Sequence, residues 1–393
     1  MNDKTILILS PDYPSEHGEF NGSNAVKNQL AYSKKMFKKV IVIVPVLKTG
    51  GITPQDKYCH DYSYDNVDVY FPRCFFLPRI IKIPGVSNYT KVSIDSRLFA
   101  TLDTIKTHNL TFDLIHAHFT YPSAFIASEL KKRFPVPVIS TIHEDSGWFE
   151  EERKMNHPRF VQAWNSADLL TRVNTTELSI LKQYNPNVVH VPGGYDPESY
   201  TYIGKVHSRK LLNLPQTDKM VFAFGFLDER KGFQDLIAAI AHLPAQYSAV
   251  KCYISGNGYY KTQLESLIKE FGLEKRVFLI SRLVDKDVAV WINAADLFIM
   301  PSLRESFGST QIEALGCGTP VIASDNVGSI DIINDTCGYL FKIGDSLDLS
   351  SQIINGLTTH WDTAKILDYA KNKYAWNVVS KQFDKFYTEL MNR

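Results

Sequence analysis

Two glutamates eight positions apart form the part of this sequence best placed to do chemistry. Glu305 lies in segment 301–308 (PSLRESFG), and Glu313 follows inside a helical pattern. A loop that leads into a helix leaves backbone N–H groups available to an anion. A carboxylate has two acceptor oxygens, which suit a pair of hydroxyl groups. Together these features favour a ligand that carries both phosphates and sugar hydroxyls, such as a sugar nucleotide.

Each residue of this segment then has an expected role. Glu305 would reach the sugar, and the backbone amides of Ser306, Phe307 and Gly308 would bind the phosphates. Glu313 would accept hydrogen bonds from both ribose hydroxyls. An apolar strand pattern follows directly at 321–323.

Two cations have a similar placement upstream, in segment 224–232 (FGFLDERKG), which follows a strand pattern and opens a helical one. Arg230 and Lys231 at the start of a helix would meet a diphosphate that the amide dipoles already favour. Alone, such a dipeptide is more often a solvated pair. Its occurrence in the same chain as the two glutamates favours a phosphate-binding role.

These two segments carry a resemblance to a known family. The E-x7-E spacing with its PS-x-x-E-x-F-G lead-in resembles the retaining glycosyltransferases of family 4, which have the GT-B fold. The family's usual upstream pattern is G-R-L-x-x-x-K-G, so Lys231 matches it but Phe226 stands at the arginine position. The resemblance implies that Lys231 and Glu305 act on the donor diphosphate and sugar. Whether Arg230 supplies the missing guanidinium stays open.

The resemblance implies further donor-binding positions. Gly258 lies in a strand-end turn, 254–259 (ISGNGY), that resembles the loop beneath the nucleotide, although turns need glycine for steric reasons alone. Arg282 and Leu283 fall where the family's backbone contacts the nucleobase. Gly18 fits a glycine-rich loop against the donor phosphates, and a tight turn explains it equally well.

Three histidines in the first half of the chain are also candidates. His143 ends a strand pattern at the sheet edge where α/β folds place ligands. The resemblance implies that it is a catalytic residue near the donor sugar, and a structural role is the alternative. His116 and His118 share one face of a strand, as metal ligands sometimes do. A zinc or iron site that adds His143 and Asp145 is a minor hypothesis, because the donor-binding motifs explain the site without a metal.

The composition excludes some classes of function. The 393 residues carry a net charge of only +1, so no global charge favours a nucleic-acid partner. The five cysteines have neither C-x-x-C spacing nor the density of a disulfide framework, which favours a reducing compartment. The first apolar run is too short for a secretory signal, and no run of about twenty apolar residues predicts a membrane-spanning helix. We therefore expect a cytoplasmic protein.

Two segments mix cations with apolar residues. Segment 34–39 (KKMFKK) closes the first predicted helix, and segment 74–83 (CFFLPRIIKI) interleaves aromatic, aliphatic and basic residues. Such segments can rest among lipid headgroups, while helix-end lysines and core packing are the alternatives. Peripheral contact with the inner face of a membrane is thus a further expectation. Segment 148–153 (WFEEER) is a candidate wall of an acceptor site.

Short apolar runs alternate with helical patterns along the chain, which is typical of parallel sheets covered by helices on both faces. Strands are expected at 5–10, 40–44, 67–71, 114–117, 138–141, 169–173 and 188–191, and then at 220–224, 250–255, 277–280, 297–300 and 321–323. We therefore predict an α/β fold with two Rossmann-like domains, and the resemblance implies that their parallel sheets face each other across a cleft.

The predicted acceptor-side domain spans 1–197, and the predicted nucleotide-sugar-binding domain spans 198–374. The resemblance assigns the last helix, 375–393, to the first domain. One apolar face is expected on that helix, with Trp376, Val379, Phe383, Phe386 and Leu390.

The expected activity is transfer of a sugar from a nucleoside-diphosphate sugar to the hydroxyl of a glycan or lipid-linked acceptor, with the anomeric configuration kept. The resemblance implies a role in cell-surface polysaccharide or glycolipid synthesis, with no cofactor and no metal ion. A sugar-nucleotide 2-epimerase of the same architecture is one alternative. A non-catalytic sugar-nucleotide-binding scaffold is the other, and Phe226 is its best support.

Overall fold

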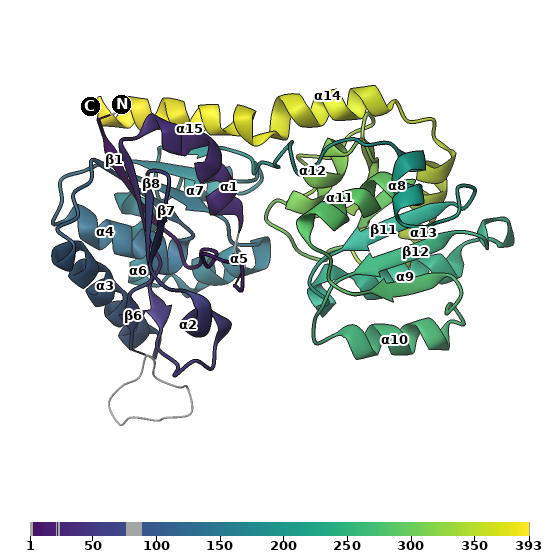
Figure 1. The fold of residues 1–393 in the computed structure, drawn as a ribbon, viewed down its shortest axis with the longest axis horizontal. Coiled ribbons are helices and arrows are strands. Elements are labelled where there is room, and N and C mark those ends of the chain that lie inside the picture. The colour runs from purple at the N-terminus through teal and green to yellow at the C-terminus, as the bar shows by residue number, and fades with distance from the viewer. Residues whose placement is uncertain (1–2, 21, 23, 76–88, 393) are drawn as a thin grey trace. The chain divides into compact units, whose positions relative to one another are not determined.

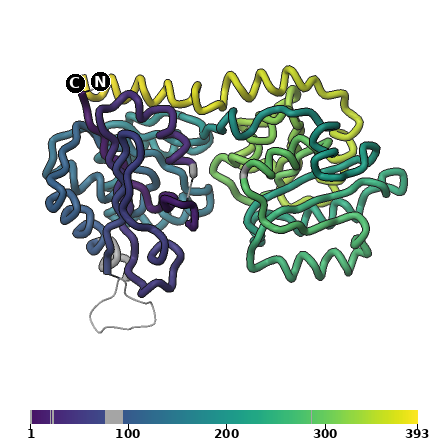
Figure 2. Tube along the Cα trace, in the orientation of Figure 1, coloured from purple at the N-terminus to yellow at the C-terminus, as the bar shows by residue number. Residues whose placement is uncertain are grey.

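The computed structural model describes residues 3–20, 22, 24–75 and 89–392. The chain forms two compact units, the first from Met1–Pro192 and Ser380–Arg393 and the second from Gly193–Val379. Figures 1 and 2 follow this path from purple to teal in the first unit, through green in the second, and into the yellow helix that ends in the first. The predicted points at which the chain passes from one unit to the other were 197/198 and 374/375.

Parallel strands form the centre of the first unit. Its strands are β1 (Thr5–Leu9), β2 (Lys39–Ile43), β3 (Val46–Leu47), β4 (Tyr62–Tyr64), β5 (Val67–Tyr70), β6 (Arg73–Cys74), β7 (Leu114–His118), β8 (Val138–Ile142), β9 (Leu169–Arg172) and β10 (Val188–His190). Within the described residues, eight of them form one sheet in the order β10-β9-β8-β7-β1-β2-β5-β4, where only the β4–β5 pair is antiparallel.

Helices lie on both sides of this sheet (Figure 1), which explains why β7 and β8 are buried at every residue. The helices of the first unit are α1 (Asn24–Ser33), α2 (Pro54–Tyr58), α3 (Tyr89–Thr107), α4 (Phe125–Lys131), α5 (Ser146–Met155), α6 (Pro158–Ser166), α7 (Leu178–Leu181) and most of α15 (Trp376–Met391). One buried cluster joins the sheet to α4, α5 and α6, with Trp164 fully buried at its centre.

The second unit has a sheet of six described strands in the order β13-β12-β11-β14-β15-β16, and every neighbouring pair is parallel. The strands are β11 (Met220–Phe224), β12 (Lys251–Ser255), β13 (Val277–Ile280), β14 (Leu297–Met300), β15 (Val321–Ser324) and β16 (Gly338–Phe341). The helices are α8 (Lys205–Leu211), α9 (Phe233–His242), α10 (Lys261–Glu270), α11 (Asp285–Ala294), α12 (Ser309–Gly316), α13 (Ser346–Thr358) and α14 (Thr363–Tyr374).

The prediction of an α/β fold with two Rossmann-like parallel-sheet domains is confirmed. Each expected strand occurs at its predicted place, with ends that shift by one residue or so, and β3, β4, β6 and β16 were not expected. On α15 the buried stripe consists of Trp376, Val379, Phe383, Tyr387 and Leu390, so Tyr387 takes the place expected for Phe386. The reason is that the stripe continues by a step of four residues after Phe383, as the helical period allows.

Two further findings bear on the setting of the protein. The five cysteines are all buried and free. Within the described ranges, no helix combines the length and the apolar character needed to span a bilayer.

Candidate active site

The loop after β11 brings two cations to the carboxyl edge of the second sheet. The Asp228 side chain accepts a hydrogen bond from the Lys231 N–H at 3.0 Å, which fixes the short 3-10 turn Glu229–Lys231. Gly232 follows with a left-handed φ of 69°, and a Cβ there would lie 1.9 Å from the Pro301 carbonyl oxygen. Only glycine fits such a position. The turn is therefore packed directly against the loop that carries Glu305.

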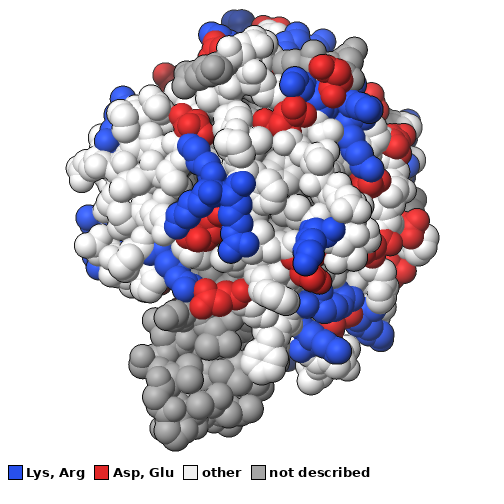
Figure 3. Space-filling view, turned by 90° about the vertical axis from the view of Figure 1, so that its left-hand side faces the viewer, with Lys and Arg blue, Asp and Glu red and all other residues white. Residues whose placement is uncertain are grey.

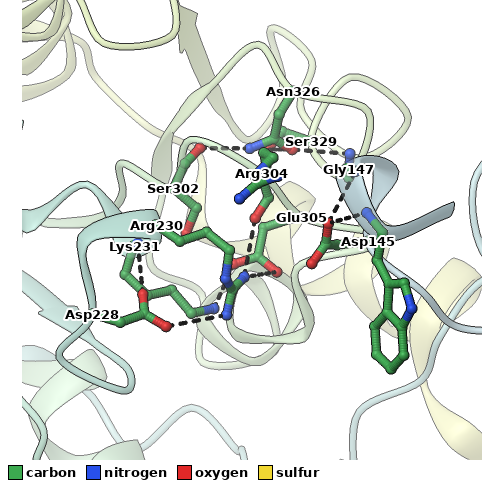
Figure 4. Close-up of polar contacts among 12 residues, drawn as sticks. Asp145, Gly147, Asp228, Arg230, Lys231, Ser302, Arg304, Glu305, Asn326 and Ser329 are labelled. Atoms are coloured by element: carbon green, nitrogen blue, oxygen red, sulfur yellow. Dashed lines mark hydrogen bonds and ion pairs between the residues drawn. The ribbon is translucent and has the colours of Figure 1, made fainter. Parts of the chain in front are cut away.

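Arg230, Lys231 and Glu305 form one ion-pair cluster (Figure 4). Lys231 Nζ lies 2.5 Å from Glu305 Oε1, and Arg230 Nη1 lies 3.9 Å from Glu305 Oε2. The Arg230 guanidinium also lies 3.5 Å from the Asp228 carboxylate and donates to the Arg304 carbonyl oxygen at 3.2 Å. The Lys231 side chain is 20% exposed and that of Glu305 11%, so the pair is largely buried.

Hydrogen bonds hold the loop that carries Glu305. The Leu303 N–H donates to the Arg230 carbonyl oxygen at 2.8 Å, which joins this loop to the 229–231 turn. On the other side, Asn326 Nδ2 donates to the Ser302 carbonyl oxygen at 2.9 Å (Figure 4). The loop ends at Gly308, whose left-handed φ of 69° starts α12 without a side-chain cap. A helix start of this kind suits an anion.

The other predicted residues of this segment have different environments. Phe307 is buried, and its ring packs so closely on Gly193 that a Cβ there would lie 2.6 Å from it. The Phe307 side chain is therefore a packing group, and only its N–H is suited to a phosphate. Ser306 is partly exposed, and Glu313 lies on α12 and is partly buried.

A cavity of about 350 Å³ opens at the same edge of the second sheet. The structure brings Arg282 and Leu283 together here with Phe226 and the 255–257 loop. This volume falls in the range of small-molecule sites. The full lining consists of Phe224, Gly225, Phe226, Ser255, Gly256, Asn257, Arg282, Leu283 and Val288.

Gly258 does not line this cavity but supports its wall. A Cβ at Gly258 would lie 2.1 Å from the Leu227 carbonyl oxygen, so glycine is required by the close approach of two loops. Phe226, which replaces the family arginine, is 55% exposed. Its ring meets that of the exposed Tyr259 edge to face at 6.3 Å. At position 226 the cavity therefore has an aromatic ring where the family pattern has an arginine.

Gly18 lies in the first unit, in the exposed loop after β1. Its φ of 80° is left-handed, and the Ser15 side chain closes the loop by accepting from the Phe20 N–H at 3.0 Å. The turn geometry by itself explains the glycine.

His143 follows β8 at the carboxyl edge of the first sheet and is partly exposed. Burial lowers its pKa to about 3, with the Arg172 charge as a second cause, so the ring is neutral near pH 7. The aromatic ring of Phe119 packs on it at 4.8 Å, and Trp148, on α5, is 44% exposed and lies 6.5 Å from Phe119. These rings form an aromatic surface beside His143.

The hypothesis of a metal site with His116, His118, His143 and Asp145 finds little support in the geometry. Both ring nitrogens of His116 are hydrogen-bonded to hydroxyl groups, and Asp145 caps α5 by accepting from the Gly147 and Trp148 N–H groups. Over the part of the chain that the structure describes, no group of three or more His, Cys, Asp or Glu side chains is arranged to hold a metal ion.

Sequence reasoning missed a pair of buried acids next to His143. Glu144 accepts from the Thr120 N–H at 2.6 Å, and Glu152 on α5 is 1% exposed with no hydrogen-bond partner for either carboxyl oxygen. Burial raises the pKa of Glu152 to about 9, and the Glu144 charge adds to this effect. The run Glu150-Glu151-Glu152 looks solvated in sequence, and only the helical phase of α5 could have indicated that its last member faces inward.

The structure describes the basic segment 34–39 in full and segment 74–83 only in part. Of segment 74–83, residues 76–83 lie outside the described residues, and Phe75 is 59% exposed. In segment 34–39, Lys34 pairs with Asp65, and Lys39 pairs with Asp68 at 2.5 Å. The face of the first unit in Figure 3 correspondingly mixes Lys and Arg with Asp and Glu.

Comparisons with known proteins agree with this geometry. Residues 205–373 match the family model for glycosyl transferases group 1, and residues 58–199 match the model for glycosyltransferase family 4. The chain is 29% identical over 315 residues to a D-inositol 3-phosphate glycosyltransferase of Corynebacterium jeikeium. This match covers 72% of this chain and 74% of that protein. It is also 29% identical over 289 residues to the putative teichuronic acid biosynthesis glycosyltransferase TuaC of Bacillus subtilis. This match covers 72% of this chain and 70% of that protein.

Among solved structures, Anabaena HepE in complex with UDP-glucose is similar, with a TM-score of 0.72 and 19% identity over 98% of this chain and 100% of that one. At that identity the likeness shows the fold alone. The two family models follow each other along the chain: the family 4 model covers the first unit from residue 58, and the group 1 model covers the second sheet with the clustered Arg230, Lys231 and Glu305. The chain therefore belongs to the GT-B glycosyltransferases of the family 4 type.

Proposed function

We propose that this glycosyltransferase is a retaining enzyme that transfers a hexose from a nucleoside-diphosphate sugar to an acceptor hydroxyl. The observation that carries the proposal is the cluster of Arg230, Lys231 and Glu305 at the sheet edge where the 350 Å³ cavity opens. The HepE structure contains UDP-glucose, which makes a uridine nucleotide the first donor to test.

The two cations are assigned to the donor diphosphate. Lys231 supplies an ammonium and Arg230 a guanidinium, and a diphosphate is the kind of anion that such a pair binds. Arg230 takes the role of the arginine missing at Phe226, because its guanidinium already lies 3.9 Å from Glu305, in the same cluster as Lys231. The amides of Ser306, Phe307 and Gly308 add donors at the start of α12.

Glu305 is assigned to the donor sugar. In the structure its carboxylate is neutralised by Lys231, and a bound diphosphate would draw that ammonium away. The freed carboxylate oxygens would then accept hydrogen bonds from sugar hydroxyls. The nucleoside is assigned to the cavity lined by Arg282 and Leu283, with Gly258 supporting its wall, and Glu313 is assigned to the ribose.

The proposed reaction breaks the bond between C1 of the sugar and the diphosphate oxygen. The acceptor oxygen forms the new bond on the face that the diphosphate leaves, so the anomeric configuration is kept. The acceptor proton goes to a departing phosphate oxygen. Lys231 and Arg230 stabilise the negative charge that grows on the diphosphate, and they are fixed in place before the reaction. The proposal assigns no step to a metal ion, because these donors already meet that charge.

The first unit is assigned to the acceptor. His143 is neutral and partly exposed, so it can hydrogen-bond a substrate hydroxyl without bringing a charge. Trp148, exposed on α5 near Phe119, offers a ring face on which a sugar can stack. Gly18 is assigned to the donor phosphates by resemblance alone.

We further propose that the acceptor is a glycan or lipid-linked saccharide of a cell-surface polymer, reached from the cytoplasmic face of a membrane. The name of the teichuronic acid relative supports this choice, whereas the D-inositol 3-phosphate relative shows that small acceptors occur in the same group. Cosedimentation with vesicles that contain anionic lipid tests the membrane contact. Equal recovery with neutral and anionic vesicles would contradict it.

Release of nucleoside diphosphate in the presence of acceptor tests the activity. The protein is incubated with UDP-, GDP- and ADP-sugars and a panel of acceptors, and product linkage is read by NMR. Lys231→Ala should abolish release, whereas Lys261→Ala, an exposed lysine on α10 of the same unit, should not. Acceptor-dependent product with inverted configuration would refute the retaining mechanism.

A scaffold without turnover is the second candidate, because Phe226 removes a cation that the family pattern contains. It predicts binding of a nucleotide without acceptor-dependent release across the whole panel.

A further inference from the structure

Three histidine rings form a row in the first unit, two of them on β7 and the third just after β8. The His116 and His118 rings stack with their centroids 4.2 Å apart, whereas the His143 ring meets His118 edge to edge and roughly coplanar, with the centroids 5.3 Å apart. His118 Nδ1 lies 3.0 Å from His143 Nε2, which is a hydrogen bond. His116 and His118 are buried, and His143 alone of the three is partly exposed. The row of rings therefore ends at His143, the residue assigned to the substrate.

A chain of hydrogen bonds holds His116, which lies at the other end of this row of rings. His116 Nδ1 lies 2.8 Å from the Tyr387 hydroxyl of α15, and His116 Nε2 lies 2.7 Å from the Thr141 hydroxyl. Gln29 Nε2 donates to the same tyrosine oxygen at 3.2 Å, and Thr141 bonds Thr171 at 2.7 Å. Since both nitrogens of His116 are held by groups from other elements, its ring cannot rotate without breaking two buried hydrogen bonds.

The direction of these hydrogen bonds follows from the donors present. Because Gln29 already donates to the Tyr387 oxygen, the tyrosine proton is left for His116 Nδ1, which then accepts. The remaining His116 proton lies on Nε2 and is donated to Thr141. His116 is thus a neutral ring with one defined tautomer, and it presents its flat face to His118.

Phe119 closes the other side of His143. Its backbone has φ 70° and ψ 148°, a region that non-glycine residues rarely adopt. The Phe119 N–H donates to the Thr141 carbonyl oxygen at 2.8 Å, and the ring packs against His143 at 4.8 Å. The His143 ring therefore lies between His118 and Phe119, which restricts its orientation from two sides.

A single proton must be shared between His118 Nδ1 and His143 Nε2. Burial lowers the pKa of both rings, and the neighbouring histidines add to this for His118 and the Arg172 charge for His143, so both rings stay neutral. The Nε2–H tautomer is the intrinsically preferred form of neutral imidazole. If His143 Nε2 donates and His118 Nδ1 accepts, both rings adopt that preferred form. The Nδ1 of His143 is then left without a proton.

We infer that His118 is a positioning residue that accepts the His143 Nε2 proton and so leaves His143 Nδ1 as a hydrogen-bond acceptor for a substrate hydroxyl. The inference rests on the proposed role of His143 at the substrate. It predicts that the nitrogen of His118, and not merely its ring, matters for turnover.

The tautomer is tested on the full chain with histidine rings labelled with 15N. Long-range 1H–15N spectra should show His143 protonated at Nε2 and bare at Nδ1, with the signals assigned by a His143→Gln variant. In His118→Phe, which keeps a stacked ring but no nitrogen, His143 should shift to a mixture of tautomers. An unchanged His143 spectrum in that variant would overturn the inference, as would a wild-type His143 protonated at Nδ1.

Kinetics give a second, separate readout. His118→Phe should lower kcat by about 10- to 100-fold, by analogy with the loss of a hydrogen-bond partner that orients a metal-bound histidine, with a smaller change in the donor KM. His118→Asn, whose amide oxygen can accept near the Nδ1 position, should recover most of kcat, and exposed His60→Asn is the control. Equal loss in the Phe and Asn variants, at matched thermal stability, would show a purely structural role and refute positioning.

The two readouts separate the inference from the proposed function. If no donor and acceptor pair gives turnover, the proposed function fails, and the spectra still decide whether His118 sets the tautomer of His143. If turnover occurs and His118→Phe changes neither spectra nor kcat, the inference fails and the function stands.

Discussion

Replacing Glu152 by glutamine should stabilise the protein, and the gain should grow with pH. The wild-type carboxyl is 1% exposed, without a hydrogen-bond partner, and has a pKa of about 9 against 4.5 for an unperturbed glutamate. In the unfolded chain Glu152 loses its proton above about pH 4.5, while the folded protein keeps it up to about pH 9. The unfolded state therefore binds fewer protons in this window, and the free energy of unfolding falls as pH rises.

Each pH unit in that window costs about 1.4 kcal/mol, so the penalty relative to a neutral side chain is about 3 kcal/mol at pH 7. Glu152→Gln carries no charge in either state and should not show this loss. Urea unfolding of wild type and variant at pH 5.5, 6.5 and 7.5 measures the difference. Glu151→Gln, an exposed neighbour on α5, is the matched control.

Only an acid that is buried without compensation gives a stability difference that depends on pH in this way. The stability difference between Glu152→Gln and wild type should increase with each step in pH, while Glu151→Gln should differ from wild type by a constant amount. A Glu152→Gln variant that is less stable than wild type at pH 7.5, or a difference that stays the same across the three values, would refute the burial of an uncompensated acid.

Three further outcomes follow from the structure. Glu313→Ala should weaken donor binding by about 2 to 3 kcal/mol through loss of two charge-assisted hydrogen bonds, and calorimetry against Glu265→Ala measures it; equal affinities would remove Glu313 from the donor site. Chelation should leave turnover intact, and an activity abolished by chelator but restored by one added metal ion would revive the histidine metal site. Tyr387→Phe should lower the free energy of unfolding by about 1 to 3 kcal/mol, because His116 and Gln29 lose a buried partner; a urea midpoint equal to wild type would contradict the polar chain.

The sheets were predictable because buried parallel strands are typically continuous apolar runs, and β1, β2, β11 and β14 supply them. Strand β16 (Gly338–Phe341) was missed because it is short, begins with glycine and has only two buried residues. On α15 the apolar residues Phe383, Phe386 and Tyr387 allow two continuations of the stripe. Packing against the first unit selects Tyr387, and its hydroxyl is needed by His116.

The donor-side candidates were visible for a related reason. Lys231 and Glu305 follow strands β11 and β14, which are neighbours in one parallel sheet, so their loops meet at one edge. The His118–His143 contact and the burial of Glu152 could not be predicted in this way. They depend on ring orientation and on helix phase, which are set by tertiary packing and leave no local pattern in the sequence.

The central claim is that Lys231 binds the diphosphate and Glu305 binds the sugar of one donor molecule. Calorimetric titration of wild type and Glu305→Gln with UDP and with UDP-glucose tests it most directly. Glu305 neutralises Lys231 in the structure, so we expect Glu305→Gln to bind UDP at least as tightly as wild type. The same variant should bind UDP-glucose more weakly than wild type. Equal weakening for both ligands, or no change for UDP-glucose, would contradict it.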